Sequence, residues 1–191
     1  QFEDLTEVFS ACAAAACYRR SMFDDIGVFD EDFFCYMEDI DIGIRARLAG
    51  YRCLAVPAAR VYHIGSATTG GDMSEFSVRM TAKNIFNVLL KDIPAPMLFM
   101  MLPKVIAAQT VLVFQSLFTR QRPKLRKNMR GYWQGIGGAL RQAPLMLRKR
   151  RDIQRARRIS SHQFSVLLRA SEQQKRAGRG TLAISERGQP R

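Results

Sequence analysis

The sequence predicts an α/β fold over residues 1–70, followed by an α-helical C-terminal region. Residues 1–70 mix short apolar runs with acidic clusters and with glycine or proline turn signals. Residues 71–118 are strongly apolar and residues 119–191 are strongly basic, and both contain helical patterns. The length of 191 residues and the 47% apolar content suit one domain with an appendage, and they exclude a disordered or collagen-like chain.

The first elements are short. Residues 8–18 are a run of small apolar side chains that fits either a buried strand or a helix, because its periodicity does not distinguish the two. Residues 19–26 are predicted to form a short helix that Gly27 ends. Residues 52–57 are predicted to form a short buried strand that Pro57 stops.

Residues 38–50 carry the clearest helical pattern. Acidic side chains fill the first turn and arginines the last, as the helix dipole favours. Asp41 and Arg45 are spaced to pair at i, i+4, and Gly50 is placed to end the helix. One apolar stripe at i, i+4 and i+8 consists of Ile40, Ile44 and Leu48.

Residues 71–118 are predicted to be a helical apolar region that is interfacial or membrane-embedded. Asp72 resembles a helix cap for a helix to about residue 91. Residues 97–118 are a run of 22 residues with one charge, Lys104. As a helix this run would be about 33 Å long, close to the ~30 Å hydrocarbon thickness of a bilayer. Pro103 and Lys104 interrupt it, which favours a helix in the membrane plane over a span.

Charge divides the chain into two parts. Residues 1–118 carry 10 basic and 14 acidic side chains, whereas residues 119–191 carry 20 and 3. A basic segment next to an apolar one is attracted to an anionic membrane surface. Nucleic-acid binding is the alternative, but aromatic side chains for base stacking are few, so no specific nucleic acid is expected. Residues 119–170 are predicted to be helical and residues 171–191 to be a disordered tail.

The cysteines and the first residues indicate in which redox compartment the protein resides and whether the chain starts with a secretory leader. The spacing of the four cysteines is not that of a zinc or thioredoxin-type site, so they are interpreted as small buried side chains in a reducing compartment. The first residues lack the basic start and apolar run of a secretory leader, so we expect the chain to begin inside a larger protein. The cysteines are Cys12, Cys17, Cys35 and Cys53.

Residues 27–52 contain a candidate catalytic motif, GVFDEDFFCYMEDIDIGIRARLAGYR, and the segment VYHIGS follows at residues 61–66. About a dozen of these positions agree in register with the acceptor-side signature of inverting family 2 glycosyltransferases. The chain resembles this family over residues 18–70, and within it the bacterial rhamnosyltransferase-type enzymes. The resemblance implies that residues 1–70 are the C-terminal part of a Rossmann-like GT-A catalytic domain, an incomplete half.

The resemblance also implies residue roles. Asp39, the aspartate of the Glu-Asp pair, maps to the general base that takes the proton of the acceptor hydroxyl. A solvated first helical turn is the alternative for the acidic cluster, and a structural partner of Asp41 is the alternative for Arg45. The implied acceptor-binding or orienting residues are Glu38, Asp41, Asp30, Glu31 and Arg45.

A divalent cation, Mn²⁺ or Mg²⁺, is expected to neutralise the nucleoside diphosphate leaving group. His63 maps to a metal ligand of the family, and a satisfied core histidine is the alternative. No D-x-D motif precedes residue 27, so the other ligands and the nucleotide pocket are expected from a missing N-terminal half. The chain alone is therefore expected to be an incomplete catalytic unit.

The expected function is sugar transfer with inversion in cell-surface polysaccharide (cell wall) biosynthesis. The expected partners are a nucleotide-sugar donor, a glycan or lipid-linked acceptor and an anionic membrane surface. The expected location is the cytoplasmic face of the cell membrane, peripheral or single-pass. A noncatalytic membrane-surface or nucleic-acid-binding module, driven by the basic C-terminal region, is the alternative.

Overall fold

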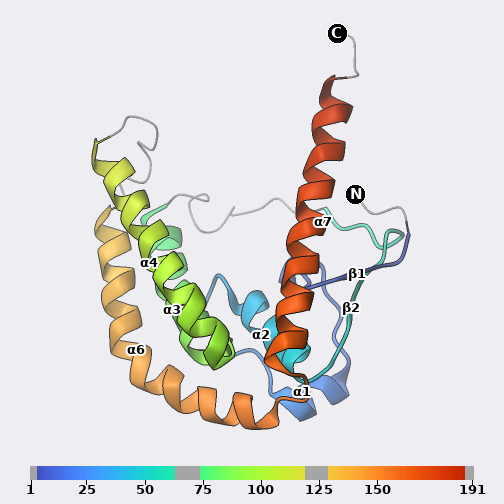
Figure 1. The fold of residues 1–191 in the computed structure, drawn as a ribbon, viewed down its shortest axis with the longest axis horizontal. Coiled ribbons are helices and arrows are strands. Elements are labelled where there is room, and N and C mark those ends of the chain that lie inside the picture. The colour runs from blue at the N-terminus through green and yellow to red at the C-terminus, as the bar shows by residue number, and fades with distance from the viewer. Residues whose placement is uncertain (1–3, 63–73, 119–128, 188–191) are drawn as a thin grey trace.

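Helices dominate the computed structural model, which describes residues 4–62, 74–118 and 129–187 (Figure 1). Strands β1 (Thr6–Val8) and β2 (Cys53–Ala55) form a two-stranded antiparallel sheet with Glu7 opposite Leu54. The described residues 4–62 thus combine strand and helix, with less strand than the sequence predicted. The helical elements are η1 (Ala13–Ala15), α1 (Arg20–Ile26), α2 (Glu38–Leu48), α3 (Glu75–Asp92), α4 (Ala95–Phe118), α6 (Met129–Ala156) and α7 (Ser161–Arg187).

The helix ends follow local signals. Gly27 ends α1 with a φ of 77°, and its N–H donates to the Phe23 carbonyl at 2.9 Å. Gly50 follows α2 with a φ of 87°, a left-handed conformation that glycine adopts without steric cost. At the start of α3 the Ser74 side chain accepts a hydrogen bond from the Ser77 N–H at 3.1 Å. The predicted cap, Asp72, lies outside the described residues.

The small-residue run at 8–18 is neither a buried strand nor a helix. Beyond β1 it contains the single 3₁₀ turn η1, whose alanines are exposed. Alanine and cysteine side chains gain little from burial because their apolar area is small. The predicted burial of the cysteines is wrong for Cys12 and Cys17, which are exposed, whereas Cys35 and Cys53 are partly buried; all four thiols are free.

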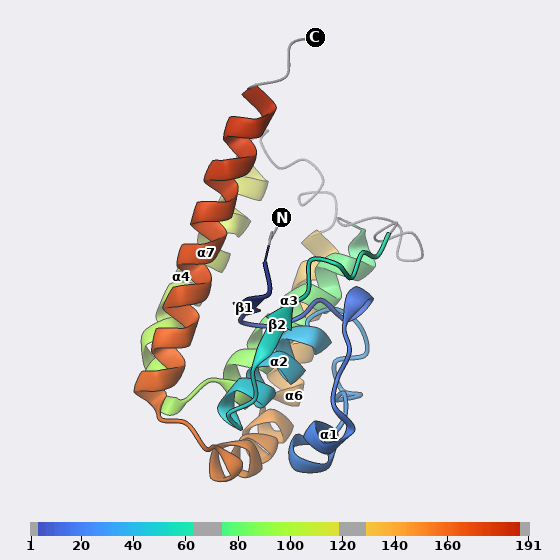
Figure 2. The same ribbon diagram turned by 90° about the vertical axis from the view of Figure 1, so that its right-hand side faces the viewer.

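The core lies where α2, α3, α6 and α7 meet. Phe33, in the segment before α2, and Phe164 of α7 are both 0% exposed. Figure 2 shows α4 and α7 on one side of α2, α3 and α6. β2 is less buried than predicted, with Leu54 45% exposed. The buried apolar cluster consists of Phe33, Ile44, Leu48, Val88, Leu89, Ile93, Met146 and Phe164.

Helix α6 packs along α3 and then bends. A Cβ atom at Gly131 or Gly135 would overlap the backbone of α3, so glycine allows the two helices to approach closely. Helix α6 contains Pro144, and part-way along its length the helix turns to run beneath the molecule (Figure 1). A proline inside a helix removes one backbone hydrogen bond and bends the helix. The bend carries the basic second half of α6 under α2.

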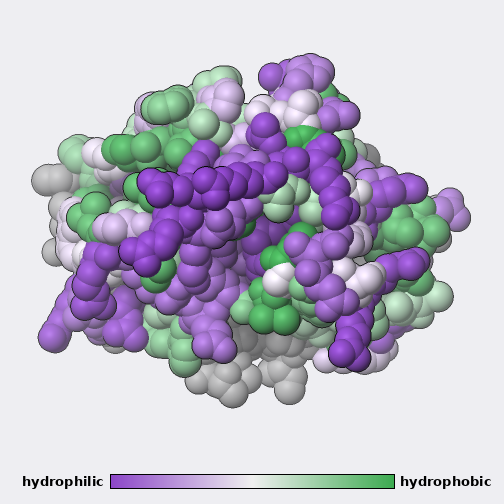
Figure 3. Space-filling model, turned by 90° about the horizontal axis from the view of Figure 1, so that it is seen from below, coloured by the Kyte–Doolittle hydropathy of each residue, from purple (hydrophilic) through white to green (hydrophobic). Residues whose placement is uncertain are grey.

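The outer helices differ in character. Residues Ala95–Phe114 of α4 have a mean hydropathy of 1.9 and are long and apolar enough to cross a membrane, and no part of this window is buried. Helix α7 continues to Arg187, whereas the sequence predicted a disordered tail from residue 171. Residues 172–177 consist of Glu, Gln, Lys, Arg and Ala, all strong helix formers. The underside of the molecule, where α6 runs, is mostly hydrophilic (Figure 3).

We expect Gly135→Ala to lower the free energy of unfolding by about 1–3 kcal/mol, since its methyl group would overlap the Arg79 carbonyl and approach the Ala82 Cβ to 2.9 Å. Gly137→Ala is the matched control, because a Cβ there meets nothing within 4 Å. The control should leave stability unchanged or raise it by up to ~1 kcal/mol through helix propensity. Urea unfolding of both variants tests this, and equal stabilities would contradict the packing.

Candidate active site

The Glu-Asp pair opens helix α2. Asp39 is partly exposed, and its Oδ1 accepts from the Ile40 N–H at 2.8 Å while its Oδ2 accepts from the Ala13 N–H at 3.4 Å. The Ser10 hydroxyl donates to the Asp39 carbonyl at 3.1 Å. The segment after β1 therefore holds the start of α2 from one side.

Glu38 lies beside Asp39 and is also partly exposed. Among the described residues its Oε2 atom is buried with no hydrogen-bond partner. Burial, followed by the negative charge of Asp39, raises the pKa of Tyr18, and burial followed by the charge of Glu38 raises the pKa of Cys35. The charge of Asp39 is therefore close enough to act on Tyr18, and that of Glu38 close enough to act on Cys35.

The segment that leads into α2 is strained. Phe34, Tyr36 and Met37 have φ values of 62°, 65° and 70°, in the left-handed region that costs a non-glycine residue about 1–3 kcal/mol. Asn84 of α3 compensates for this conformation. Its Nδ2 donates to the carbonyls of residues 33, 35 and 36 at 3.0, 2.9 and 2.7 Å.

A buried ionic network lies beneath this segment. Asp41 is 0% exposed, and it pairs with Arg45 at 2.8 Å and with Lys91 of α3. Lys91 also pairs with Asp30 at 2.5 Å, and Lys149 of α6 pairs with Asp30 at 2.6 Å. Arg45 donates to three carbonyls, those of residues 26, 27 and 28, at 2.6, 3.2 and 2.9 Å. The network fixes the 26–30 segment, α2, α3 and α6 to one another.

The network shifts pKa values in opposite directions. Burial disfavours the charged form of Asp30, but hydrogen bonds from Lys149 and Lys91 outweigh burial and lower its pKa to about 2. Asp92 is 0% exposed, and burial followed by the negative charge of Asp41 raises its pKa well above the usual range. Asp92 therefore favours its neutral form beside a network of charged groups.

The structure separates the residues singled out in the sequence. Glu38 and Asp39 stand together at the start of α2, whereas Asp30, Asp41 and Arg45 lie in the ionic network, and Glu31 is exposed. His63 lies outside the described residues. The roles assigned to these residues stay predictions.

The described residues do not form a metal centre by themselves. Within the described part of the chain, no three His, Cys, Asp or Glu side chains gather as ligands for a metal ion. Asp30 and Asp41 are neutralised by cationic side chains, which leaves them poor ligands.

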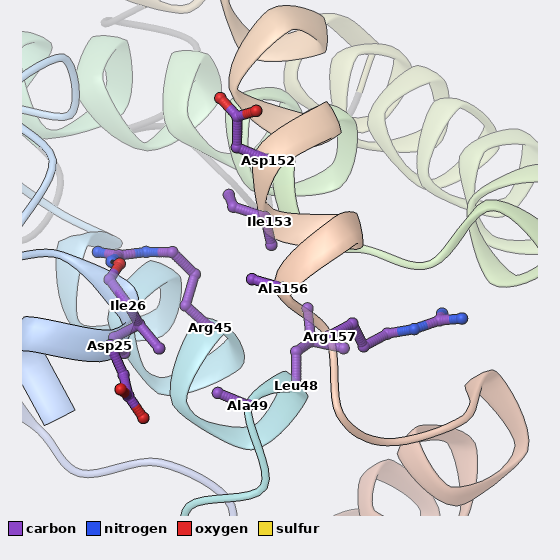
Figure 4. A pocket seen from close by; sticks show the side chains of 9 residues that line it. All are labelled: Asp25, Ile26, Arg45, Leu48, Ala49, Asp152, Ile153, Ala156 and Arg157. Atoms are coloured by element: carbon purple, nitrogen blue, oxygen red, sulfur yellow. Dashed lines mark hydrogen bonds between the residues drawn. The ribbon is translucent and has the colours of Figure 1, made fainter.

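A cavity of about 150 Å³ lies at the other end of α2 (Figure 4). It stands between α1, the C-terminal end of α2 and the last turns of α6. Sites for nucleotide-sized ligands are usually about 300–1,000 Å³, so this cavity is too small for a nucleotide sugar. Its lining is formed by Asp25, Ile26, Arg45, Leu48, Ala49, Asp152, Ile153, Ala156 and Arg157.

The sequence of this chain matches the model of a known protein family. The family model of glycosyl transferase family group 2 matches residues 1–119, more than half of the chain. The chain belongs to this family. The match bears out the resemblance of the 27–52 motif, and membership in this family implies a GT-A fold.

Two relatives from Mycobacterium tuberculosis, of strains CDC 1551 / Oshkosh and ATCC 25618 / H37Rv, are each 48% identical to the chain over 54 residues. Both are named N-acetylglucosaminyl-diphospho-decaprenol L-rhamnosyltransferase. The aligned residues make up 28% of this chain and 18% of each relative, so the chain spans less than a fifth of the curated relatives it matches. No solved structure matches the chain.

Two residues of α3 were not predicted from the sequence to take part in the site. Asn84 is 0% exposed and bound to the segment before α2. Lys91 is 3% exposed and lies between two aspartates. The sequence gives only a weak indication that Asn84 and Lys91 are buried: both lie on the same face of α3 as apolar residues.

We expect Asp92→Asn to stabilise the protein increasingly as pH rises. A carboxyl whose pKa is raised by folding makes the folded state lose stability as pH rises from the unfolded value, ~3.9, through the folded one. The asparagine removes this loss, so variant and wild type should be similar near pH 4 and diverge towards about pH 8. Urea unfolding across this range measures the difference.

Asp152→Asn is the matched control, because the Asp152 side chain is 81% exposed and its pair with Arg155 is 3.9 Å long. It should change stability little at any pH. A difference between Asp92→Asn and wild type that does not depend on pH would contradict the raised pKa of Asp92.

Proposed function

We propose that this chain is the acceptor-side part of an inverting glycosyltransferase of rhamnosyl- or hexosyl-transfer type, acting in cell-surface polysaccharide biosynthesis. The observation that carries the proposal is the partly exposed Glu38–Asp39 pair at the start of α2, inside the segment that matches the family. The relatives' name gives a diphospho-decaprenol-linked sugar as acceptor, which supports a lipid-linked acceptor here.

Asp39 would act as the general base. As the acceptor hydroxyl oxygen forms its bond to the anomeric carbon, the hydroxyl proton passes to an Asp39 carboxylate oxygen. The bond from that carbon to the phosphate oxygen breaks on the opposite face, and the nucleoside diphosphate leaves with the electron pair. One in-line displacement of this kind inverts the configuration.

The neighbouring acids would have supporting roles. Glu31, which is exposed, and Glu38, which is partly exposed, would orient the acceptor. Asp30, Asp41 and Arg45 would act through the fold, by fixing the position of α2. A bound Mn²⁺ or Mg²⁺ would neutralise the diphosphate, with His63 as one ligand and further ligands from the donor half.

In the full-length protein, Asp39→Asn should lower turnover by about 10²–10⁴-fold, the usual loss on removing a general base, while the dissociation constant for the nucleotide sugar stays within about threefold. The measurement combines steady-state transfer to a lipid-linked acceptor with calorimetric binding of dTDP-, UDP- and GDP-sugars. Glu31→Gln, which neutralises an exposed acid in the same motif, is the control and should affect mainly the acceptor KM. Turnover of Asp39→Asn close to wild type would rule out Asp39 as the base.

We propose further that α4 contacts the cytoplasmic face of the membrane. Helix α4 exposes large apolar side chains along its length, including Phe99 at 78% and Ile106 at 50%. The second half of α6 exposes Arg148, Arg151 and Arg155. The underside of the molecule is mostly hydrophilic (Figure 3). Apolar insertion and attraction of arginines to anionic lipid act together at a membrane surface.

We expect the protein to bind phosphatidylglycerol-containing vesicles at low salt, and the double variant Phe99→Glu/Ile106→Glu to bind at least ~10-fold more weakly, since burying an anion among acyl chains is unfavourable. Gln173→Glu, on exposed α7, is the control and should bind like wild type. Carbonate extraction then separates a surface helix, which is released, from a span, which is retained. A protein that stays in solution with these vesicles would contradict both arrangements.

A further inference from the structure

We propose that Asn84 is a positioning residue that holds the 33–37 segment, with its three left-handed residues, in place and thereby sets where α2 and its Glu-Asp pair begin. This inference rests on the proposed function for its effect on turnover. Its effect on the 33–37 segment can be measured without any transfer activity.

The hydrogen bonds of Asn84 have one possible direction. All three groups that face its amide are backbone carbonyls, at 2.7 to 3.0 Å, and carbonyls only accept. The Nδ2 group must therefore be the atom that faces them. Asn84 is 0% exposed, so water cannot replace its donors when they are removed.

None of the three left-handed residues before α2 is a glycine, so each adopts a backbone conformation that is strained for its residue type. Phe34, Tyr36 and Met37 all carry side chains, and Phe34 is 78% exposed, so its burial does not compensate for its backbone strain. The chain turns its carbonyls towards α3 because of this conformation. Donors at Asn84 satisfy the carbonyls that the strained backbone presents, and they stabilise it over an ordinary extended segment.

The backbone conformation of the 33–37 segment determines the position of the candidate base, Asp39, because this segment leads directly into α2. Met37 is the residue before α2, and its carbonyl accepts the Asp41 N–H at 2.9 Å as the first hydrogen bond of the helix. Asp39 lies two residues after Met37. A change in the backbone of residues 36–37 therefore moves the first turn of α2, which carries the Asp39 carboxylate.

Neighbouring amides support Asn84 from the other side. The Asn87 Nδ2 donates to the Gln142 Oε1 of α6 at 2.8 Å and lies 3.5 Å from the Asn84 Oδ1. Asn87 is also 0% exposed and stands on the same helix. Its shorter hydrogen bond goes to α6, and its 3.5 Å contact with Asn84 is to the Oδ1 atom, not to the Nδ2 that binds the carbonyls of residues 33, 35 and 36. It is a matched control for the loss of a buried amide that does not itself reach the 33–37 segment.

The experiment compares Asn84→Ala, Asn84→Ser and Asn87→Ala in the full-length protein. Serine keeps one short donor and leaves a smaller cavity, so it serves if alanine prevents folding. Activity is corrected for the folded fraction, and hydrogen exchange is followed by mass spectrometry on the peptide that contains residues 33–37.

We expect Asn84→Ala to lower kcat by about 10–100-fold with the donor KM within about threefold, since a shift of about 1 Å in a catalytic group can cost 10²-fold. Exchange in residues 33–37 should become at least ~10-fold faster, with Asn84→Ser in between. Asn87→Ala should lose similar stability while its kcat and its exchange in residues 33–37 stay within about threefold of wild type.

Unchanged exchange in the Asn84 variants, or an equal loss of kcat in Asn87→Ala, would overturn the inference. Unchanged kcat together with faster exchange would also overturn it, because the segment would then not position the site. If Asp39→Asn keeps its turnover while Asn84→Ala loses it, the assignment of the base fails and the positioning role of Asn84 is supported.

Discussion

Lys91 lies almost wholly out of water between Asp30 and Asp41, and the rest of the molecule is arranged around this contact. Its ammonium also stands 4.8 Å from the centre of the Phe33 ring, in the core. A lysine buried in this way needs its carboxylates, because removing one partner of a buried pair costs about 3–5 kcal/mol. The pairing therefore constrains the segment before α2, the helix α2 and the helix α3 to a single relative position.

The strained segment spans the gap between these fixed points. Asp30 and Asp41 are both held by Lys91, so the ten-residue stretch between them must fit a set distance. Phe33 fills the core at 0% exposure, and the backbone then turns through left-handed residues to reach α2. The hydrogen bonds of Asn84 offset the energetic cost of that turn. Helix α3 supplies both Asn84 and Lys91.

Local signals allowed the sequence to predict part of this. The extent of α2, its stop at Gly50 and the Asp41–Arg45 pair follow from spacing within one helix. The contacts of Asn84 and Lys91 could not be predicted in this way, since their partners lie 48 to 61 residues earlier in the chain. A polar side chain on a helix gives the same pattern whether it is solvated or bound to a distant backbone.

The ionic network also separates the acids of the motif by what each can do. A carboxylate that pairs with a buried cation would lose that pairing on accepting a proton, as for Asp30, whose pKa falls to about 2. Among the described residues, neither Glu38 nor Asp39 takes part in an ion pair. Asp39 is instead held by backbone N–H groups at the start of a helix, which fix its position and leave it open on one side. Asp41 and Asp30 hold the start of α2 in place, which supports the proposal that Asp39, in the same first turn, accepts the proton.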